Sequence, residues 1–300
     1  MLKQECVSNI LLVGNGILRA YDEESCDDYI NKLCEKNKIS YSKDELKKLS
    51  FNQRVVVASR DNVDSYAKGE LSNLSSITFT EEQLSFYRRI IELKIDAILT
   101  TNYSFELENS IYKDWNKNLH WKFRKYFKNK EKLTENEKKF GLYECVDLPI
   151  NDSHKNIFHI HGNADAPNSI IIGHYYYGKL ISQIQDYLPL FFRRCKMAEK
   201  KGYDYQPQNW VDYFMVSNIY IMGFGLDLAE MDLWWLICCK KRYYSNTKII
   251  LYEAKDKIDI QRKMMLETYG IEICDKIKVI NDNYKDFYDR VLRDIVKRVS

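Results

Sequence analysis

The sequence predicts an α/β protein built on a parallel sheet with helices on both faces, and three observations lead to that prediction. Short apolar runs rich in β-branched residues recur along the 300 residues, and such runs are typical of strands that are covered on both faces. Each run ends in a glycine or polar turn. The segments between the runs are long, charged and helix-like, which favours alternating strands and helices. The expected strands are Asn9–Val13, Ile95–Leu99, Ile157–Ile160, Ile170–Ile172, Val216–Met222, Lys248–Leu251 and Ile277–Ile280.

Two segments are expected to be helical insertions that form a lobe beside the sheet, over approximately residues 105–150 and 180–212. The first contains Tyr112–Lys139, which is dense in Lys, Asn and aromatic residues, and the second contains the helix-like Leu180–Tyr205. A charge-rich helix is more often a solvated face than a partner site. The final segment, Tyr284–Ser300, carries apolar residues at helical spacing, so we expect it to be a helix that packs on the core.

Composition limits the class of protein. No linker, repeat or low-complexity tract divides the chain, so we expect a single domain over residues 1–300, without a separate sensor module. Lys and Arg total 46 against 43 Asp and Glu, a net charge of +3, which argues against nucleic acid as a partner. No secretory signal and no apolar run of about 18 residues is present. A cytoplasmic protein without membrane contact is therefore expected, and its eight cysteines are expected to be reduced.

The first expected strand runs into a glycine turn with the sequence Gly14-Asn15-Gly16-Ile-Leu-Arg19-Ala20. Glycines after a buried strand let backbone N–H groups approach a phosphate, and the next helix adds its positive end. The segment is not a full G-x-G-x-x-G motif, because Arg19 stands at the sixth position. A plain strand-to-helix turn is as compatible with this segment as a nucleotide site.

The second expected strand delivers Thr100, Thr101 and Asn102 into a turn. The side-chain amide of Asn102 is suited to fixing a ribose hydroxyl or a water molecule. Asn is also a favoured N-cap of helices. A purely capping role for Asn102 is therefore equally compatible with the sequence.

The third expected strand carries His159 and His161, which strand alternation points to one face, followed by Gly162. A His-x-His pair can ligate zinc, but no Cys or acidic residue accompanies this pair at ligand spacing, so no metal is expected. A buried structural histidine is the ordinary alternative for either residue. Open α/β sheets bind ligands at the carboxyl ends of their strands, and the near-neutral pKa of histidine suits a general base there.

A fourth strand ends in Gly223-Phe224-Gly225, ahead of Asp227 and Asp232, and the next strand ends in Glu253. A carboxylate at such a strand end can accept both hydroxyls of an adenosine ribose. A surface glutamate without a ligand is equally compatible with this position. Together the strand ends G-x-G, T-T-N, H-G and G-x-G are expected to line one crevice at the carboxyl edge of the sheet.

In this order the motifs resemble those of the sirtuin superfamily, which carries G-A-G near its start, T-Q-N-x-D, a catalytic H-G and a later G-T-S. The chain is most similar to the sirtuin-like domains of bacterial antiphage defence systems, such as that of the NAD-degrading effector of Thoeris. Variants of this type read G-x-G-x-x-R-A and T-T-N-Y. The matching segments are Gly14–Ala20, Thr100–Tyr103, His161-Gly162 and Gly223–Gly225, and the resemblance spans Ile10 to about Glu253.

The resemblance implies a Rossmann-like fold and NAD as the substrate, cleaved between nicotinamide and ribose. It implies that His161 is the catalytic base and that Asn102 orients a water or a ribose hydroxyl. It places Gly14, Asn15, Gly16 and Arg19 at the pyrophosphate and Gly223, Gly225 and Glu253 on the adenosine side, with Thr100, Thr101 and Phe224 as further NAD-binding residues.

The departures from the family pattern refine the expected function. Deacylating sirtuins carry a zinc module of two C-x-x-C pairs and this chain has none, which argues against protein deacylation. Ser104 stands where the family usually has Asp, and Leu18 where a Ser is common. We therefore expect an NAD glycohydrolase that forms nicotinamide and ADP-ribose, or a cyclised form of it, as an abortive-infection effector. The alternatives are an NAD-dependent protein deacylase and a non-catalytic NAD- or nucleotide-sensing module. A regulatory or sensor protein encoded nearby, or a homo-oligomeric switch, is expected to restrain the activity.

Overall fold

A computed structural model of the chain describes residues 8–21, 26–60, 62–112, 115, 124–126, 142–150, 153–243, 246–254 and 258–300. Within these residues, eight strands form one sheet in the order β3-β4-β5-β2-β1-β6-β7-β8. All neighbours from β5 to β8 pair in parallel, and β3 and β4 add an antiparallel edge. On one side of β1 the chain winds outward through β6, β7 and β8, as in doubly wound α/β folds. On the other side it passes from β2 to the edge strand β3 and returns through β4 to β5. The strands are β1 (Asn9–Val13), β2 (Ala97–Thr100), β3 (Arg124–Tyr126), β4 (Glu144–Ile150), β5 (Ser153–His159), β6 (Asn218–Met222), β7 (Ile249–Tyr252) and β8 (Ile271–Ile273).

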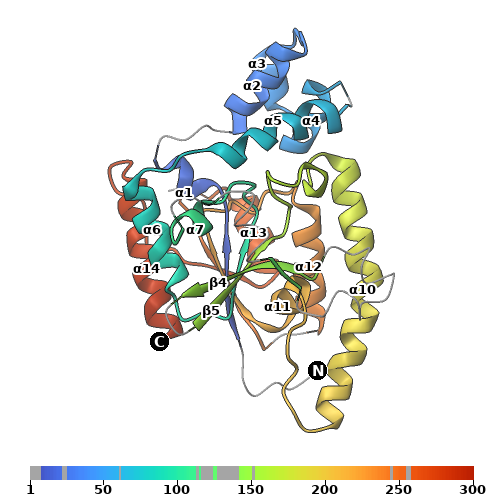
Figure 1. Cartoon of the computed structure of the whole chain (residues 1–300), viewed down its shortest axis with the longest axis vertical. Coiled ribbons are helices and arrows are strands. Elements are labelled where there is room, and N and C mark those ends of the chain that lie inside the picture. Colours follow the sequence, from blue (N-terminus) through green and yellow to red (C-terminus); the bar gives the residue numbers. More distant parts are fainter. Residues whose placement is uncertain are drawn as a thin grey trace.

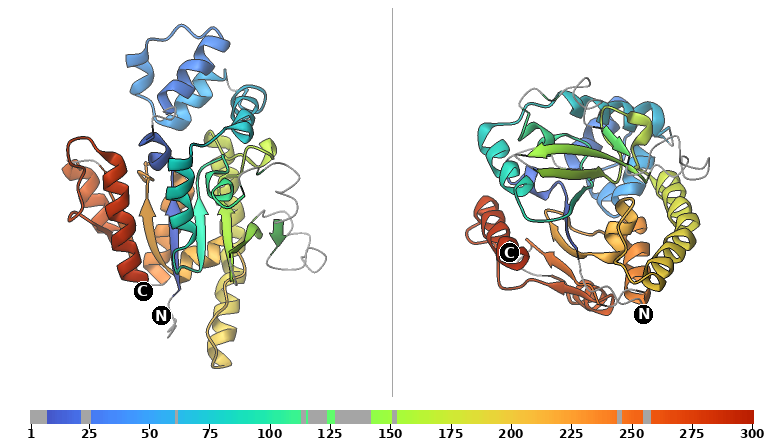
Figure 2. Two further views of the ribbon diagram at one scale, coloured as in Figure 1. Left: turned by 60° about the vertical axis from the view of Figure 1, so that its left-hand side comes forward. Right: turned by 60° about the horizontal axis from the view of Figure 1, so that its bottom comes forward.

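Helices cover both faces of the sheet, which confirms the predicted fold class (Figures 1 and 2). Ile10 and Leu12 of β1 lie in a core shared with α10, α11, α12 and α13. Leu11 and Val13 lie in a second core shared with α1, α6, α7 and α14. This alternation is expected of a strand that is covered on both sides. The helices are α1 (Gly16–Arg19), α6 (Glu81–Ile91), α7 (Glu106–Asn109), α10 (His174–Lys200), α11 (Trp210–Val216), α12 (Met231–Tyr243), α13 (Ile260–Thr268) and α14 (Tyr284–Val299).

Two buried lysines satisfy carbonyl groups at the ends of helices. The ammonium of Lys240, in α12, donates to the carbonyl oxygens of Phe214, Met215 and Ser217 at 3.0, 2.9 and 2.6 Å. These carbonyls belong to the end of α11, where the helix leaves such groups without an internal partner. Lys155 makes equivalent contacts just beyond α6. Burial lowers the pKa of Lys240 well below its ordinary value and that of Lys155 to about 8.

A small helical lobe is inserted between β1 and β2 and lies beyond the carboxyl edge of the sheet (Figure 1, blue to cyan). It has a core of its own that includes Leu33 and Val55. The buried side chain of Asn52 accepts the N–H of Gly173 at 3.1 Å and donates to the carbonyl of Ala229 at 3.0 Å. These bonds tie the lobe to the loops that follow β5 and β6. The lobe consists of α2 (Cys26–Lys36), α3 (Lys43–Lys47), α4 (Phe51–Ala58), η1 (Asp64–Lys68), α5 (Gly69–Leu71) and η2 (Ser72–Ser76).

Two of the predicted strands are wrong. Ile170–Ile172 follows the short helix η4 (Pro167–Ser169), and its apolar side chains are buried because they pack into the core of the lobe. Ile277–Ile280 lies in an irregular segment before α14, with Ile277 and Val279 packed against a helix-covered face of the sheet. The edge strand β8 comes earlier in the chain. Ile170 and Ile172 are buried, whereas Ile277 and Val279 are partly buried and Ile280 is exposed. An apolar run alone does not distinguish such packing from pairing in a sheet.

The predicted helical insertion over residues 105–150 is also wrong, because its described residues form α7 and the edge strands β3 and β4. Within Tyr112–Lys139, residues 113–114, 116–123 and 127–139 lie outside the described residues. The segment 180–212 is helical as predicted, but α10 packs on the sheet through its buried face instead of forming a lobe. The final helix is confirmed as α14. Among the described residues, the search for a helix long and apolar enough to cross a membrane finds none.

Candidate active site

The predicted motifs all follow one row of paired residues that crosses the sheet. The register aligns His159 with Thr100, Thr100 with Val13, Val13 with Met222, and Met222 with Tyr252. Because these strands are parallel, the residues that come next lie together at the carboxyl edge, where α/β sheets bind ligands. One position after the row come Thr101, Gly14, Gly223 and Glu253, and two positions after it come His161, Asn102, Asn15 and Phe224.

The glycines of the first motif bring the loop after β1 against the loop after β6. A Cβ atom on Gly14 or on Gly16 would lie 2.7 Å from the carbonyl oxygen of Gly223, which is too close for a real contact. The N–H of Gly14 donates to Met222 at 3.1 Å, and that of Gly16 donates to Gly223 at 2.6 Å. The glycines are therefore required for the packing of the two loops, and these two N–H groups, expected at a phosphate, are engaged within the protein.

Two further residues of the first motif, Asn15 and Arg19, lie at the same strand end. Asn15 is half-buried and directly precedes α1, and its side chain makes no capping hydrogen bond to that helix. Arg19 is exposed in the last turn of α1. An amide and a guanidinium are both suited to phosphate oxygens.

Glu253, which was expected to accept a ribose, forms an ion pair. Its carboxylate accepts from Nη2 of Arg262 at 2.8 Å, and the same nitrogen donates to the carbonyl of Gly225. The Glu253 side chain is only 8% exposed, so the pair is largely buried. Arg262 of α13 therefore connects the end of β7 to the loop after β6, next to the half-buried Phe224.

Asn102 lies in the turn after β2, where three of its four polar groups are held by the protein. Its N–H donates to Oγ1 of Thr100 at 3.1 Å, its carbonyl accepts from Nδ1 of His159 at 3.0 Å, and its Nδ2 donates to Oε1 of Glu106 at 2.6 Å. The remaining group, Oδ1, is buried and has no hydrogen-bond partner among the described residues. The N-cap of α7 is Phe105, so the alternative that Asn102 caps the following helix is wrong.

His159 fixes the backbone of Asn102 from the neighbouring strand. A carbonyl only accepts, so Nδ1 of His159 carries a hydrogen, and Nε2 shares a second proton with Oε1 of Glu108 at 2.9 Å. Desolvation lowers the pKa of His159, but the charge and the hydrogen bond of Glu108 more than offset this, so the pKa is raised. His159 therefore has a structural partner on each ring nitrogen.

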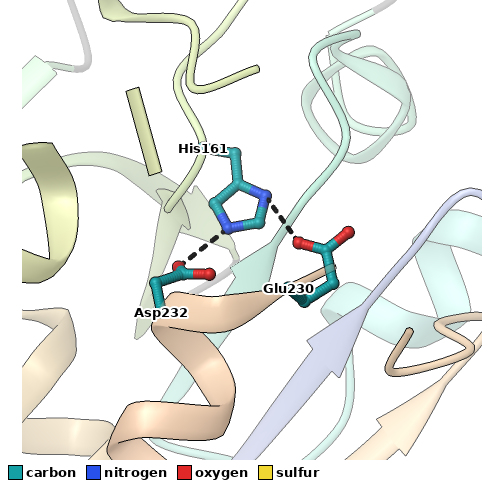
Figure 3. A group of neighbouring side chains, drawn as sticks. All are labelled: His161, Glu230 and Asp232. Atoms are coloured by element: carbon teal, nitrogen blue, oxygen red, sulfur yellow. Dashed lines mark hydrogen bonds and ion pairs between the residues drawn. The ribbon is translucent and has the colours of Figure 1, made fainter. Parts of the chain in front are cut away.

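His161 lies between two carboxylates at the end of β5 (Figure 3). Its Nε2 is 3.0 Å from Oδ2 of Asp232, and its Nδ1 is 3.8 Å from Oε2 of Glu230, beyond hydrogen-bond distance. The hydroxyl of Tyr177 donates to the same oxygen of Glu230 at 2.6 Å, and its ring meets His161 edge to face. Because a carboxylate accepts, the neutral imidazole carries its proton on Nε2. The lone pair of Nδ1 is then available as a base.

The charges around His161 set its protonation. Burial lowers the pKa of His161, but the charge and hydrogen bond of Asp232 and the charge of Glu230 more than offset this, so the pKa is raised. Burial raises the pKa of Glu230, and burial together with the Glu230 charge raises that of Tyr177 well above its ordinary value. Tyr177 therefore remains a hydrogen-bond donor over the whole physiological pH range.

The same three residues also form a potential metal-ligand set, since one ligand atom from each lies within 4.8 Å of the others. An imidazole with two carboxylates can bind several divalent ions. However, Asp232 and Glu230 face different nitrogens of His161, whereas a metal ion binds only one ring nitrogen. The arrangement therefore fits a histidine oriented between two charges better than an ion cage.

A cavity of about 270 Å³ adjoins the end of β5 and the first half of α10. Its lining includes His159, Gly162 and Lys179 of α10, but neither His161 nor Asn102 is among the described residues that line it. Gly162 has a φ of +82°, and a Cβ atom there would lie 2.2 Å from the carbonyl oxygen of Ser169. Glycine is therefore required at the position that directly follows the candidate base.

The acidic partners of His161 and Asn102 were not predicted from the sequence. Glu230 directly precedes α12 and Asp232 lies in its first turn, far along the chain from His161, so the spacing alone gave no reason to pair them. Glu106 and Glu108 form an E-x-E pair directly after the T-T-N turn, which was a signal within one helical turn of Asn102. Tyr177 lies on α10, in a segment without any motif.

No protein-family model matches the sequence, and a search of curated proteins finds no significantly similar one.

Proposed function

We propose that the protein is an NAD glycohydrolase, which converts NAD⁺ and water into nicotinamide, ADP-ribose and a proton. One observation carries the proposal. At matched positions after the adjacent strands β2 and β5, Asn102 presents a buried oxygen that has no partner among the described residues, and His161, held by a carboxylate, presents a ring nitrogen. Together with the order of the sequence motifs, this pair supports cleavage of a ribose bond.

The chemistry follows from the bond that breaks. Nicotinamide leaves as a neutral pyridine and takes the electrons of its bond to ribose, so no general acid is needed. The ribose passes through an oxocarbenium-like state. Asn102 Oδ1 accepts a hydrogen bond from the attacking water or from a ribose hydroxyl, and Nδ1 of His161 accepts the proton. Asp232 stabilises the resulting imidazolium, and a positioned base of this kind contributes about 10²–10⁴-fold. A cyclised product results when an atom of the same molecule replaces water.

NAD would be bound along the carboxyl edge of the sheet. Asn15 and Arg19 contact the pyrophosphate, while Gly14 and Gly16 shape the loop that brings them there. Phe224, Gly225 and the Glu253–Arg262 pair form the adenosine side. The support for these contacts is the common level of the strand ends together with the exposure of Arg19.

In the cell, the proposed role of the protein is to deplete NAD during infection. Cleavage of NAD in the cytoplasm would arrest an infected bacterium, as expected of an abortive-infection effector. Such an activity needs restraint, and a sensor protein encoded nearby or a homo-oligomeric switch would provide it. The resemblance to antiphage sirtuin-like domains is the support for this part.

The test is release of nicotinamide from NAD by the purified protein, alone and with the products of neighbouring genes. His161→Ala is expected to abolish release, and Asn102→Ala is expected to lower it by about 10²-fold while leaving a measurable rate. His154→Ala is the matched control, because this histidine lies on the same strand with its side chain 62% exposed, and activity is expected to be unchanged. Equal release by wild type and both site variants would refute the proposal. Binding of NAD without release under all conditions would favour a sensing module instead.

A further inference from the structure

The orientation of the Asn102 amide determines what this residue offers to a ligand. A side-chain amide has two orientations that exchange its oxygen and nitrogen, and only the hydrogen-bond partners distinguish them. In one orientation the site receives an acceptor, and in the other it receives a donor. The group that fixes this choice therefore controls the hydrogen-bonding chemistry of the site.

Glu106 fixes the orientation of the Asn102 amide. Its Oε1 lies 2.6 Å from Nδ2 of Asn102 and accepts a hydrogen bond from it, so the amide nitrogen faces Glu106. The amide oxygen is thereby turned away from Glu106, and it is buried without a hydrogen-bond partner in the part of the chain that the structure describes. A buried acceptor in this state is suited to an O–H group of a ligand, either a water or a sugar hydroxyl.

Ser104 holds Glu106 in turn. The hydroxyl of Ser104 donates to Oε2 of Glu106 at 2.7 Å, so each carboxylate oxygen has a donor from the T-T-N turn. The Glu106 side chain is fully buried.

We propose that Glu106 is a positioning residue that holds the Asn102 amide with its oxygen as the open acceptor of the site. The inference rests on the proposed function in that it concerns the group Asn102 presents to NAD. The contact does not depend on the charge of Glu106. A glutamine at this position can still accept from Asn102 through its oxygen and donate to Ser104 through its nitrogen.

The first test compares nicotinamide release by variants of the full chain. Glu106→Gln is expected to retain kcat within about threefold, whereas Glu106→Leu is expected to lose about 10- to 100-fold, because small misplacements of a site group have effects of this size. Ser104→Ala is the matched control. It removes the other hydrogen bond of Glu106 but leaves the contact with Asn102, so it is expected to cost less than Glu106→Leu.

A double variant separates positioning from a structural role. If Glu106 acts through Asn102, adding Glu106→Leu to Asn102→Ala causes no further loss in kcat. If Glu106 only stabilises the fold, the two losses multiply. Multiplied losses, or failure of Glu106→Gln to restore activity, would overturn the proposal.

The second test does not require turnover. With ¹⁵N-labelled asparagine, the side-chain hydrogens of Asn102 are identified by their absence in Asn102→Ala. They are expected to exchange slowly with solvent in the wild type and in Glu106→Gln, and at least about tenfold faster in Glu106→Leu. Rapid exchange in the wild type would refute the inference even if Glu106→Leu did not fold. A wild type that releases no nicotinamide but protects these hydrogens would refute the glycohydrolase and leave the inference standing.

Discussion

Replacement of Asp232 by asparagine tests whether the Asp232 charge stabilises the protonated form of His161. The two side chains are buried and in contact, with Oδ2 of Asp232 3.0 Å from Nε2 of His161. The substituted amide keeps the size of the carboxylate and can still accept from Nε2 through its oxygen. The change therefore removes a charge while preserving most of the geometry around the ring.

The size of the effect follows from the geometry. At an effective dielectric constant of about 20, two unit charges about 4 Å apart attract each other by about 4 kcal/mol. A difference of about 1.4 kcal/mol in activation free energy changes a rate about tenfold. Loss of this attraction on the imidazolium that forms during catalysis therefore predicts a fall in kcat of about 10²–10³-fold at neutral pH. Part of the attraction is retained by Glu230, which keeps the loss below the complete contribution of the base.

The pH dependence has a defined sign. A base must be neutral to accept a proton, so activity rises as the pH rises through the raised pKa of His161. Asp232→Asn removes the main group that raises this pKa, so the acidic limb of the profile moves to lower pH.

Nicotinamide release measured between pH 5 and 9 gives the pH at the midpoint of the acidic limb. The chemical shift of the His161 ring, followed over the same pH range, gives its pKa without turnover. Asp147→Asn, which alters an exposed pair with His154, is expected to leave both unchanged. A limb and a ring pKa that stay in place in Asp232→Asn would refute this account of His161.

Three further predictions concern stability and are checked by chemical denaturation. Gly162→Ala is expected to lower the free energy of unfolding by about 1–3 kcal/mol because of its positive φ and the contact with the chain opposite, whereas Gly178→Ala in α10, with no atom nearby, is not. Lys240→Met leaves three buried carbonyls without a donor but relieves a buried charge, so a net loss of about 2–4 kcal/mol is expected, against no change in the exposed Lys179→Met. Asn52→Ala is expected to cost about 1–3 kcal/mol and to speed hydrogen exchange at Gly173, and an unchanged exchange rate there would contradict the described link between lobe and sheet.

The parallel part of the sheet was predictable because its strands are buried on both faces and end in turn signals. The run Asn9–Val13 matches β1 in both bounds. The lobe was not predictable in the same way, because its helices are short and its core is built partly from Ile170 and Ile172, which come from a distant part of the chain. The edge strands β3 and β4 lie in a region whose charged and polar composition hid them among helix-like segments.

The candidate site was predictable as far as its residues follow strands. Asn102 and His161 were found because a turn after an apolar strand marks the carboxyl edge. Asp232 and Glu230 were not paired with His161, because their contact is created by the winding of the sheet and has no counterpart in sequence spacing. The glycine turns correctly marked the carboxyl ends of β1 and β6. The packing of the two turns against each other could not be predicted from the sequence, because it depends on the adjacency of β1 and β6 in the sheet.

The central strands end at the same level of the sheet. An added residue therefore has different consequences within a strand and within a connection between strands. A residue added within β2 or β5 would turn the side chains that follow to the opposite side of the sheet and remove Asn102 or His161 from the edge. A residue added within a connection would leave that edge unchanged. The connection between β1 and β2 already accommodates an entire lobe with its own core. Chains built on the same plan should therefore differ freely in the size of their connections while keeping the strand lengths fixed.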